Sequence, residues 1–240
     1  MIPAALIEAL AEARHVCVLT GAGVSAESGV PTFRDAQDGL WADYNPLELA
    51  TREGFSRDPA LVWRWYRWRR ELVAGVVPNA GHTALAELAG MLPRLTLVTQ
   101  NVDGLHQRAG SADVIEFHGN LFVDRCFDCG RPGDAADEEL PRCEACGGLL
   151  RPGVVWFGEA IPSDAIDRAF AAAADCEMFL SIGTSALVYP AAGLIDIARE
   201  NGAVCAEINP DPTEQAASVH FAVAGESGRV LPELLGLLAS

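Results

Sequence analysis

The sequence predicts an α/β fold, in which a doubly wound parallel sheet carries helices on both faces and a smaller lobe is attached to it. Two observations support this prediction: short apolar segments alternate with helical patterns along most of the chain, and two stretches without that alternation interrupt it. The predicted strands cover residues 15–20, 95–99, 114–117, 178–182 and 203–208, and the predicted helices cover residues 4–13, 80–91, 163–174, 191–201 and 230–238. Such alternation is typical of a parallel sheet buried on both faces.

Each element is predicted from its own pattern. The strands are short apolar runs, in chain order HVCVLT, LTLVT, VIEF, MFLSI and the segment that ends at Ile208. Runs of this length without polar alternation are typical of strands covered on both faces. The helices are longer segments in which apolar residues recur every three or four positions, as expected for one buried helix face.

The two interruptions predict a second, small lobe. Residues 35–76 contain helix-like sequence rich in Trp and Arg and no convincing strand, and residues 122–151 contain Cys pairs, Gly and Pro. We therefore expect a large nucleotide-binding domain from residues 1–34, 77–121 and 152–240. The helical insertion and the cysteine-containing insertion would together form the small lobe.

Composition narrows the class of protein. Half of the 240 residues are hydrophobic, so a large core is available, and 33 acidic against 17 basic residues give a net charge of −16. Such a chain repels nucleic-acid phosphates and anionic membranes, and no nucleic-acid or membrane partner is expected. No apolar run is long enough to span a bilayer, and the N-terminus lacks the basic region of a signal peptide. A cytoplasmic location is expected, and no oligomeric state is predicted.

Four of the seven cysteines form two close pairs. Cys126 and Cys129 are two residues apart in a C-x2-C pattern, and Cys143 and Cys146 repeat it. Two such turns facing each other can supply four thiolates to one zinc ion, and four thiolates leave no open position, so the ion would be structural. A redox dithiol is the alternative, and the repeated pair spacing favours zinc.

A glycine-rich loop follows the first predicted strand. Gly21, Gly23 and Ala26 satisfy the pattern G-x-G-x-x-G/A at the point where a strand turns into a helix, which favours binding of a pyrophosphate. The ordinary dehydrogenase version also needs an acidic residue at the end of the next strand, about 20 positions on, and no such strand is predicted here. The loop therefore predicts a bound nucleotide without predicting a dehydrogenase.

The loop continues into a longer motif with a specific resemblance. The run GAGVSAESGVPTFRD resembles the signature of the sirtuins, NAD-consuming protein deacylases. The stretches TQNVDGLH, FHGN, the two Cys pairs, VVWFGE, GTS and Asn209 then follow in the sirtuin order. The resemblance covers about residues 10–235. It implies a Rossmann-like large domain, a small zinc lobe, NAD as co-substrate and one structural zinc ion.

The resemblance also implies roles for individual residues. His118 would be the catalytic base and Asn101 a second catalytic residue, and both would also contact NAD. The other residues implied in NAD binding are Gly21, Ala22, Gly23, Ser25, Thr32, Phe33, Arg34, Gln100, Val102, Asp103, Gly183, Thr184, Ser185, Asn209, Pro210, Asp211 and Ser227. Gly183, Thr184 and Ser185 are expected to open a helix. His15, His82, His106 and His220 are interpreted as structural.

The same resemblance predicts the substrate. Tyr66 and Arg69 match the Tyr-x-x-Arg pair of the sirtuin class that recognises acidic acyl groups, and Ala50 is similar to the small residue that widens its acyl pocket. Succinyl-, malonyl- or glutaryl-lysine would then be preferred over acetyl-lysine in proteins or peptides. The substrate backbone would pair with an edge formed by Val154, Trp156, Phe157, Gly158 and Glu159. Arg64, Arg67 and Arg70 are interpreted as solvated or structural.

Other functions remain as alternatives. A plain lysine deacetylase or a mono-ADP-ribosyltransferase would share the same NAD cleft. A non-catalytic NAD sensor or zinc-ribbon interaction module is disfavoured because a sensor needs no base, whereas Asn101, Asp103 and His118 occur together.

Overall fold

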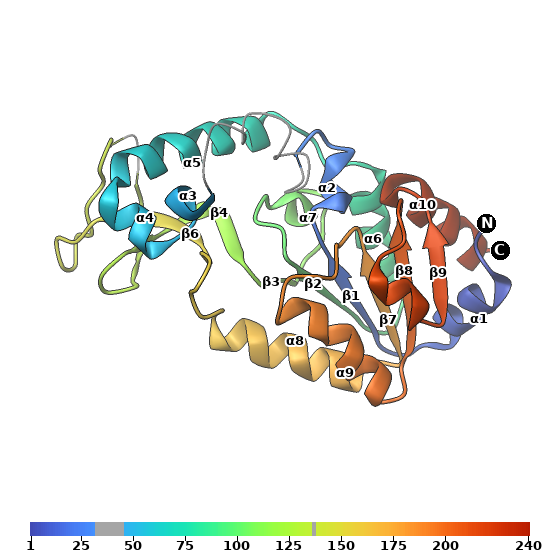
Figure 1. Ribbon diagram of the computed structural model, residues 1–240. Helices are drawn as coiled ribbons and strands as arrows, with labels where there is room; N and C mark the ends of the chain where they lie inside the picture. Colours follow the sequence, from blue (N-terminus) through green and yellow to red (C-terminus); the bar gives the residue numbers. More distant parts are fainter. Residues whose placement is uncertain (32–45, 136–137) are drawn as a thin grey trace.

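A computed structural model describes residues 1–31, 46–135 and 138–240. Its main feature is a six-stranded, all-parallel sheet with the strand order β3-β2-β1-β7-β8-β9 (Figure 1). The strands are β1 (Val16–Thr20), β2 (Leu95–Thr99), β3 (Val114–Glu116), β7 (Met178–Ile182), β8 (Val204–Asn209) and β9 (Phe221–Ala224). This topology confirms the predicted doubly wound, Rossmann-like fold. The short outer strand β9 was not predicted.

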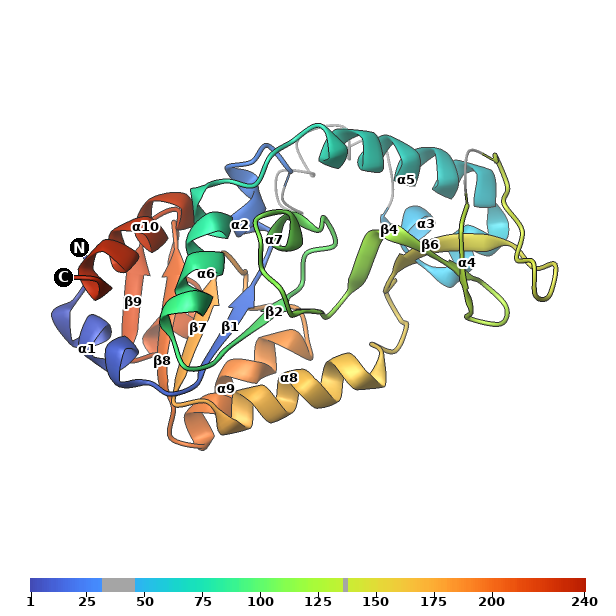
Figure 2. The ribbon, with the colours of Figure 1, turned by 180° about the vertical axis from the view of Figure 1, so that it is seen from behind.

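Helices cover both faces of this sheet (Figure 2). One face packs against α1 (Ala4–Glu12), α6 (Ala80–Met91) and α10 (Ser227–Leu238), and the other packs against α8 (Ser163–Asp175) and α9 (Leu194–Glu200). β1 and β7 are buried at every residue, which explains why their sequences are continuous apolar runs. On α8, four alanines face the core, and these small side chains allow the helix to approach the sheet closely.

One predicted helix differs from the structure. Residues 191–201 divide into a 3-10 turn, η3 (Ala191–Gly193), and the shorter helix α9. Residues 183–185 lie in an irregular loop, so the expectation that they open a helix is wrong. The Gly183 backbone has φ +60°, a left-handed conformation that does not start a right-handed helix.

A second body of structure lies beside the sheet. It contains α3 (Pro46–Leu49), α4 (Arg52–Arg57), α5 (Pro59–Ala74) and a three-stranded antiparallel sheet of β4 (Gly119–Cys126), β5 (Pro132–Gly133) and β6 (Leu150–Val154). Trp63, Trp156 and Phe55 are buried where α4 and α5 cover this small sheet, and the Trp63 indole N–H donates to the Leu150 carbonyl over 3.0 Å. Helical sequence was predicted here, whereas the strands of the small sheet were not.

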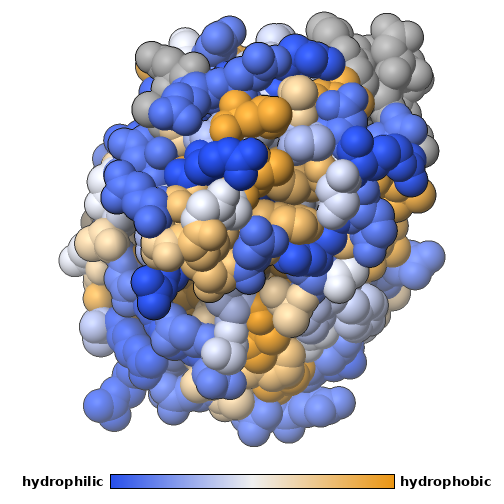
Figure 3. Space-filling view, turned by 90° about the vertical axis from the view of Figure 1, so that its left-hand side faces the viewer, coloured by the Kyte–Doolittle hydropathy of each residue, from blue (hydrophilic) through white to orange (hydrophobic). Residues whose placement is uncertain are grey.

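The end of the molecule that carries this small lobe exposes mostly hydrophilic residues, with smaller apolar areas between them (Figure 3). Among the helices that the structure describes, none combines the length and hydropathy that crossing a bilayer requires.

Candidate active site and zinc centre

Two glycine-containing turns meet at the carboxyl edge of the large sheet. β1 runs into Gly21 and Gly23, and the adjacent β7 runs into Gly183. The Gly23 N–H donates to the Gly183 carbonyl over 2.8 Å, and a Cβ at Gly21 or Gly23 would lie 2.8 Å from that oxygen. Any side chain would force the turns apart, which explains why glycine occupies these positions. Ligands of doubly wound sheets bind at this edge.

Ser25, Asn101 and Asp103 form a buried polar cluster at the same edge. Asn101 Nδ2 donates to the Gly21 carbonyl over 3.0 Å and to Ser25 Oγ over 3.1 Å. Ser25 Oγ in turn donates to Asp103 Oδ2 over 2.7 Å, while Asp103 Oδ1 accepts from the Leu105 backbone N–H over 2.9 Å. These bonds fix the orientation of three side chains that were predicted to contact NAD.

His82 also belongs to this cluster, although the sequence suggested only a structural role for it. The Asn79 backbone N–H donates to His82 Nδ1 over 3.3 Å, so Nε2 carries the proton and donates to Ser25 Oγ over 3.4 Å. Burial lowers the pKa of His82, although the nearby Asp103 and Glu27 act in the opposite direction. The available sequence signal was the Asn-x-x-His spacing, which places a histidine in the first turn of a helix capped by Asn79.

His118 lies at the junction between β3 and β4. Its Nδ1 donates to the Gln100 carbonyl over 3.1 Å, because a carbonyl can only accept. In the neutral ring, Nε2 is then unprotonated and can take up a proton. The following Gly119 has φ +78°, and a Cβ there would lie 2.1 Å from the Gly153 carbonyl oxygen. Glycine is therefore required for β6 to pass this close to the histidine.

We expect the acid limb of the kcat/KM profile to lie below pH 6.5. Burial lowers the pKa of His118 from its usual 6.5, and the hydrogen bond to Gln100 opposes this shift without cancelling it. If the neutral imidazole of His118 is the base, as the sirtuin resemblance implies, activity is retained until the pH falls through the lowered pKa. Initial rates between about pH 5 and pH 8 would measure this limb. An apparent pKa at or above 6.5 would contradict the assignment.

Two predicted acyl-pocket residues lie on α5. Tyr66 is buried, and Trp156 Nε1 donates to its hydroxyl oxygen over 2.9 Å, which leaves the phenolic hydrogen to be donated elsewhere. The guanidinium carbon of Arg69 lies 5.0 Å from the centre of the Trp65 ring. Burial lowers the pKa of Arg69, whereas Tyr66 and Asp103 raise it. Arg69 is therefore electrostatically linked to both Tyr66 and the polar cluster.

The other arginines of α5 are placed as interpreted from the sequence. Arg64 is exposed, and Arg67 donates to the Glu138 carbonyl. Arg70 Nη2 donates to Asp124 Oδ1 over 2.6 Å and so ties α5 to the small sheet. These three arginines are solvated or structural.

The segment predicted as a substrate-pairing edge is mostly a turn. β6 ends at Val154, and the Trp156 backbone N–H donates to Glu159 Oε2 over 2.9 Å, which closes the turn. The Val155 N–H donates to the His118 carbonyl over 2.8 Å, and the Phe157 N–H donates to the Ala50 carbonyl over 2.9 Å. The segment therefore connects His118 to the region of Ala50. Phe157 is exposed, and Gly158 has φ +82°.

The carboxylate of Glu159 is enclosed by arginines. Arg151 donates to it over 2.5 Å and Arg125 over 3.1 Å, and Arg52 lies 3.4 Å away. Burial alone would raise the pKa of Glu159, but the hydrogen bond from Arg151 and the other contacts lower it. This side chain therefore holds the small lobe together, and any contact with a substrate strand would come from the backbone.

The residues predicted for the remainder of NAD lie on neighbouring loops. Gln100 Nε2 donates to Thr184 Oγ1 over 3.0 Å, and Asn209 Nδ2 donates to the Thr184 carbonyl over 2.9 Å. Ser227 Oγ donates to Glu27 Oε1 over 3.1 Å at the start of α10. Val102 is half-buried. Four further residues are exposed, namely Ala22, Ser185, Pro210 and Asp211, of which the last two share one loop. Thr32, Phe33 and Arg34 lie outside the described residues.

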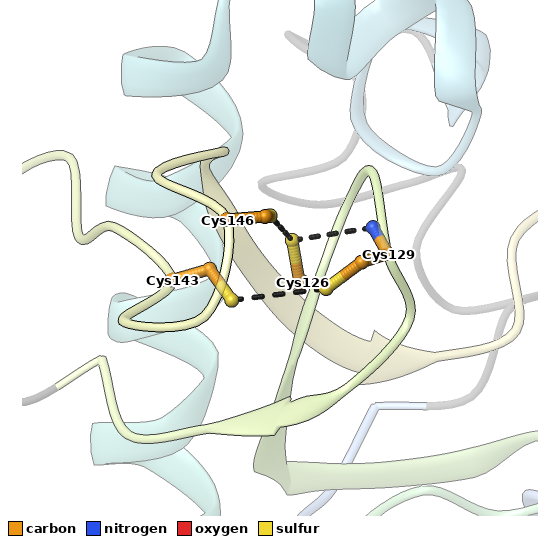
Figure 4. Close-up of side chains that lie close together, drawn as sticks. All are labelled: Cys126, Cys129, Cys143 and Cys146. Carbon is orange, nitrogen blue, oxygen red and sulfur yellow. Dashed lines mark hydrogen bonds between the residues drawn. The ribbon is translucent and has the colours of Figure 1, made fainter.

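The four paired cysteines converge on one point (Figure 4). Their sulfur atoms all lie within 4.8 Å of one another, with 3.4 Å between Cys126 and Cys146 and 3.8 Å between Cys129 and Cys143. Four sulfurs around a zinc ion at the usual bond length are about 3.8 Å apart, so the cluster fits one tetrahedral ion. The Cys129 backbone N–H donates to Cys126 Sγ over 3.4 Å, a contact that favours the thiolate a metal needs.

Comparison with known proteins agrees with this arrangement. The family model described as "Sir2 family" matches residues 21–190. A relative named "NAD-dependent protein deacylase 1" from Pseudomonas aeruginosa is 52% identical, and the match covers 96% of this chain and 97% of the relative. A solved Sir2 homologue–NAD complex has a TM-score of 0.92 at 46% identity, covering 100% of this chain and 94% of that one. A Sir2–p53 peptide–NAD+ complex has a TM-score of 0.85 at 29% identity, covering 98% of both chains.

Fold and site thus define an enzyme of the NAD-dependent protein deacylase class. The chain belongs to the Sir2 family, which confirms the resemblance read from its motifs.

Proposed function

We propose that this enzyme uses NAD to remove acyl groups from protein lysines and that it prefers succinyl, malonyl and glutaryl groups over acetyl. The observation that carries the acyl preference is the pair formed by Tyr66 and Arg69 on one face of α5. A guanidinium can hold a carboxylate through two hydrogen bonds, and the phenolic hydrogen of Tyr66 can add a third.

The size of the preference follows from the strength of such contacts. A hydrogen bond to a charged group contributes about 1.5–3 kcal/mol, which corresponds to roughly 10–150-fold discrimination between an acidic acyl group and acetyl. Arg69 suits this role because it is half-buried, and the partial loss of water, which lowers its pKa, strengthens its attraction for a carboxylate.

The glycine turns at Gly21, Gly23 and Gly183 support NAD binding, because they lie at the carboxyl edge of the large parallel sheet, where doubly wound folds bind nucleotides. When bound, NAD would supply a nicotinamide–ribose bond whose cleavage opens the ribose C1′ to attack by the acyl oxygen. Asn101 and Asp103 would orient the ribose and the nicotinamide amide. His118 would remove the proton of a ribose hydroxyl through its free Nε2.

Replacing Arg69 with methionine should lower kcat/KM for a succinyl-lysine peptide by roughly 10–150-fold and change the value for the acetyl peptide by less than about 3-fold. The reason is that methionine keeps the apolar bulk and loses the cation. A steady-state assay of nicotinamide release with NAD and matched acyl peptides measures both values.

Arg64→Met is the matched control, because Arg64 is an exposed arginine of the same helix. It should leave both activities unchanged. If Arg69→Met lowers desuccinylation and deacetylation by the same factor, Arg69 does not bind the carboxylate of the acyl group. The proposed preference for acidic acyl groups would then be refuted. Every acyl-lysine signal in such an assay belongs to the substrate, because the chain contains no lysine.

The products test the reaction class separately. With labelled NAD and a succinyl peptide, deacylation releases O-succinyl-ADP-ribose and leaves the protein unlabelled. Transfer of the label to a protein would instead identify a mono-ADP-ribosyltransferase.

A further inference from the structure

His106 is a buried histidine to which the proposed mechanism gives no role. It lies in α7 (Leu105–Arg108), directly after the polar cluster, and is 1% exposed. Its Nε2 is 2.9 Å from Thr20 Oγ1, at the carboxyl end of β1. Because the Thr20 hydroxyl donates to Thr99, it has to accept from His106, so the proton of the ring is on Nε2.

The hydrogen-bond chain continues from there to the neighbourhood of the base. Thr20 and Thr99 are partners in the register of β1 and β2, and Thr20 Oγ1 donates to Thr99 Oγ1 over 2.8 Å. Thr99 Oγ1 also accepts the backbone N–H of Asn101 over 3.1 Å. That N–H belongs to the same peptide group as the Gln100 carbonyl, which accepts from His118 Nδ1 over 3.1 Å.

We propose that His106 is a positioning residue for His118, acting through the two threonine hydroxyls and the peptide group between Gln100 and Asn101. The proposal rests on the proposed function, in which His118 Nε2 is the base. A peptide group is planar, so fixing its N–H also fixes the direction of its carbonyl. That carbonyl selects the tautomer of His118 in which Nε2 is free.

His106 does not itself take part in proton transfer. Burial, with a contribution from His82, lowers the pKa of His106 to about 3, so it stays neutral as a hydrogen-bond donor. The rings of His82 and His106 have their centres 4.8 Å apart, and Asp103 and Glu27 act on His82 rather than on His106. Nδ1 of His106 is buried without a partner among the described residues, which agrees with a ring protonated on Nε2.

Three variants test the hydrogen-bond chain that runs from His106 to His118. His106→Leu removes the first donor, and Thr20→Val removes the relay hydroxyl with almost no change of shape. His106→Gln keeps an N–H that can reach Thr20. We expect the first two to lower kcat about 10-fold or more with KM for NAD changed less than about 2-fold, and the glutamine variant to recover most of kcat. The acid limb of kcat/KM should move to lower pH in the first two, because His118 loses the carbonyl that stabilises its protonated form.

The outcomes separate this proposal from the proposed function. If the unmodified enzyme deacylates peptides and folded Thr20→Val keeps the full kcat with an unshifted acid limb, His106 does not position His118. A rise in KM for NAD together with an unshifted acid limb of kcat/KM would likewise overturn the proposal. It would mean that these hydrogen bonds only shape the NAD site. Thr20→Val keeps the test decisive if His106→Leu fails to fold. The failure of the unmodified enzyme to deacylate any acyl peptide would refute the proposed function itself.

Discussion

Replacing His118 with tyrosine should lower kcat by about 100- to 10,000-fold, the usual contribution of a general base. The tyrosine cannot accept a proton near neutral pH, and its ring has no equivalent of the Nδ1–H that donates to the Gln100 carbonyl. His118 is half-buried at the junction of two strands, so we expect the larger ring to be accommodated at the surface. The melting temperature should therefore change by less than about 4 °C. Deacylation rates and thermal unfolding measure the two effects.

A second histidine provides the control for this experiment. His220 precedes β9, where its Nδ1 accepts from the Cys205 backbone N–H over 3.0 Å, and nothing assigns it to the active site. His220→Asn should keep the full kcat. A His118→Tyr enzyme that turns over at the normal rate would refute the base assignment, whereas a large loss of melting temperature would show that His118 mainly supports the fold.

The large sheet could be predicted because its strands are buried on both faces. β1, β2 and β7 lie in the interior of the sheet, so most of their positions are apolar and the runs stand out from the helical patterns. β9 has only four residues at an edge, with alternating burial, and a run this short has little signal.

The small sheet could not be predicted for a different reason. β4 contains an irregularity in its register between Gly119 and Asp124, and β6 has the sequence LRPGV, in which Pro and Gly normally argue against a strand. These strands are held by non-local contacts, chiefly the packing of Trp63 and Trp156 and the neighbouring cysteine turns. Neither contact has a local periodicity that a sequence could reveal.

Prediction of the site from the sequence was limited in the same way. Motifs indicated Ser25, Asn101 and His118 because each lies in a run of several matched residues. The sequence could not indicate that the Gln100 backbone carbonyl contacts His118, because every residue has a backbone carbonyl and no residue type marks this one. Its importance became visible only when β2 placed it against His118.

Removing one cysteine of the cluster should abolish zinc binding and destabilise the small lobe by several kcal/mol. In Cys143→Ala, three sulfurs remain, and the free energy that the metal contributes to folding is largely lost. Zinc content should fall from one ion per chain toward zero. We also expect kcat/KM to fall more than about 100-fold, because a disordered β6 would no longer hold His118 and the proposed acyl pocket in place. Metal analysis, thermal unfolding and limited proteolysis measure these effects.

The control is Cys205→Ala, which alters a buried cysteine of β8 that lies outside the cluster. It should cost only about 1 kcal/mol and leave the zinc content at one ion per chain. The six-stranded sheet has its own two helical layers and contains none of the four clustered cysteines, so Cys143→Ala should unfold in two steps, with the small lobe melting first. A single unchanged transition with full zinc content would show that Cys143 is not a ligand. A loss of zinc without any loss of activity would instead show that α5, Trp156 and the turn after β6 hold the acyl pocket in place without the metal.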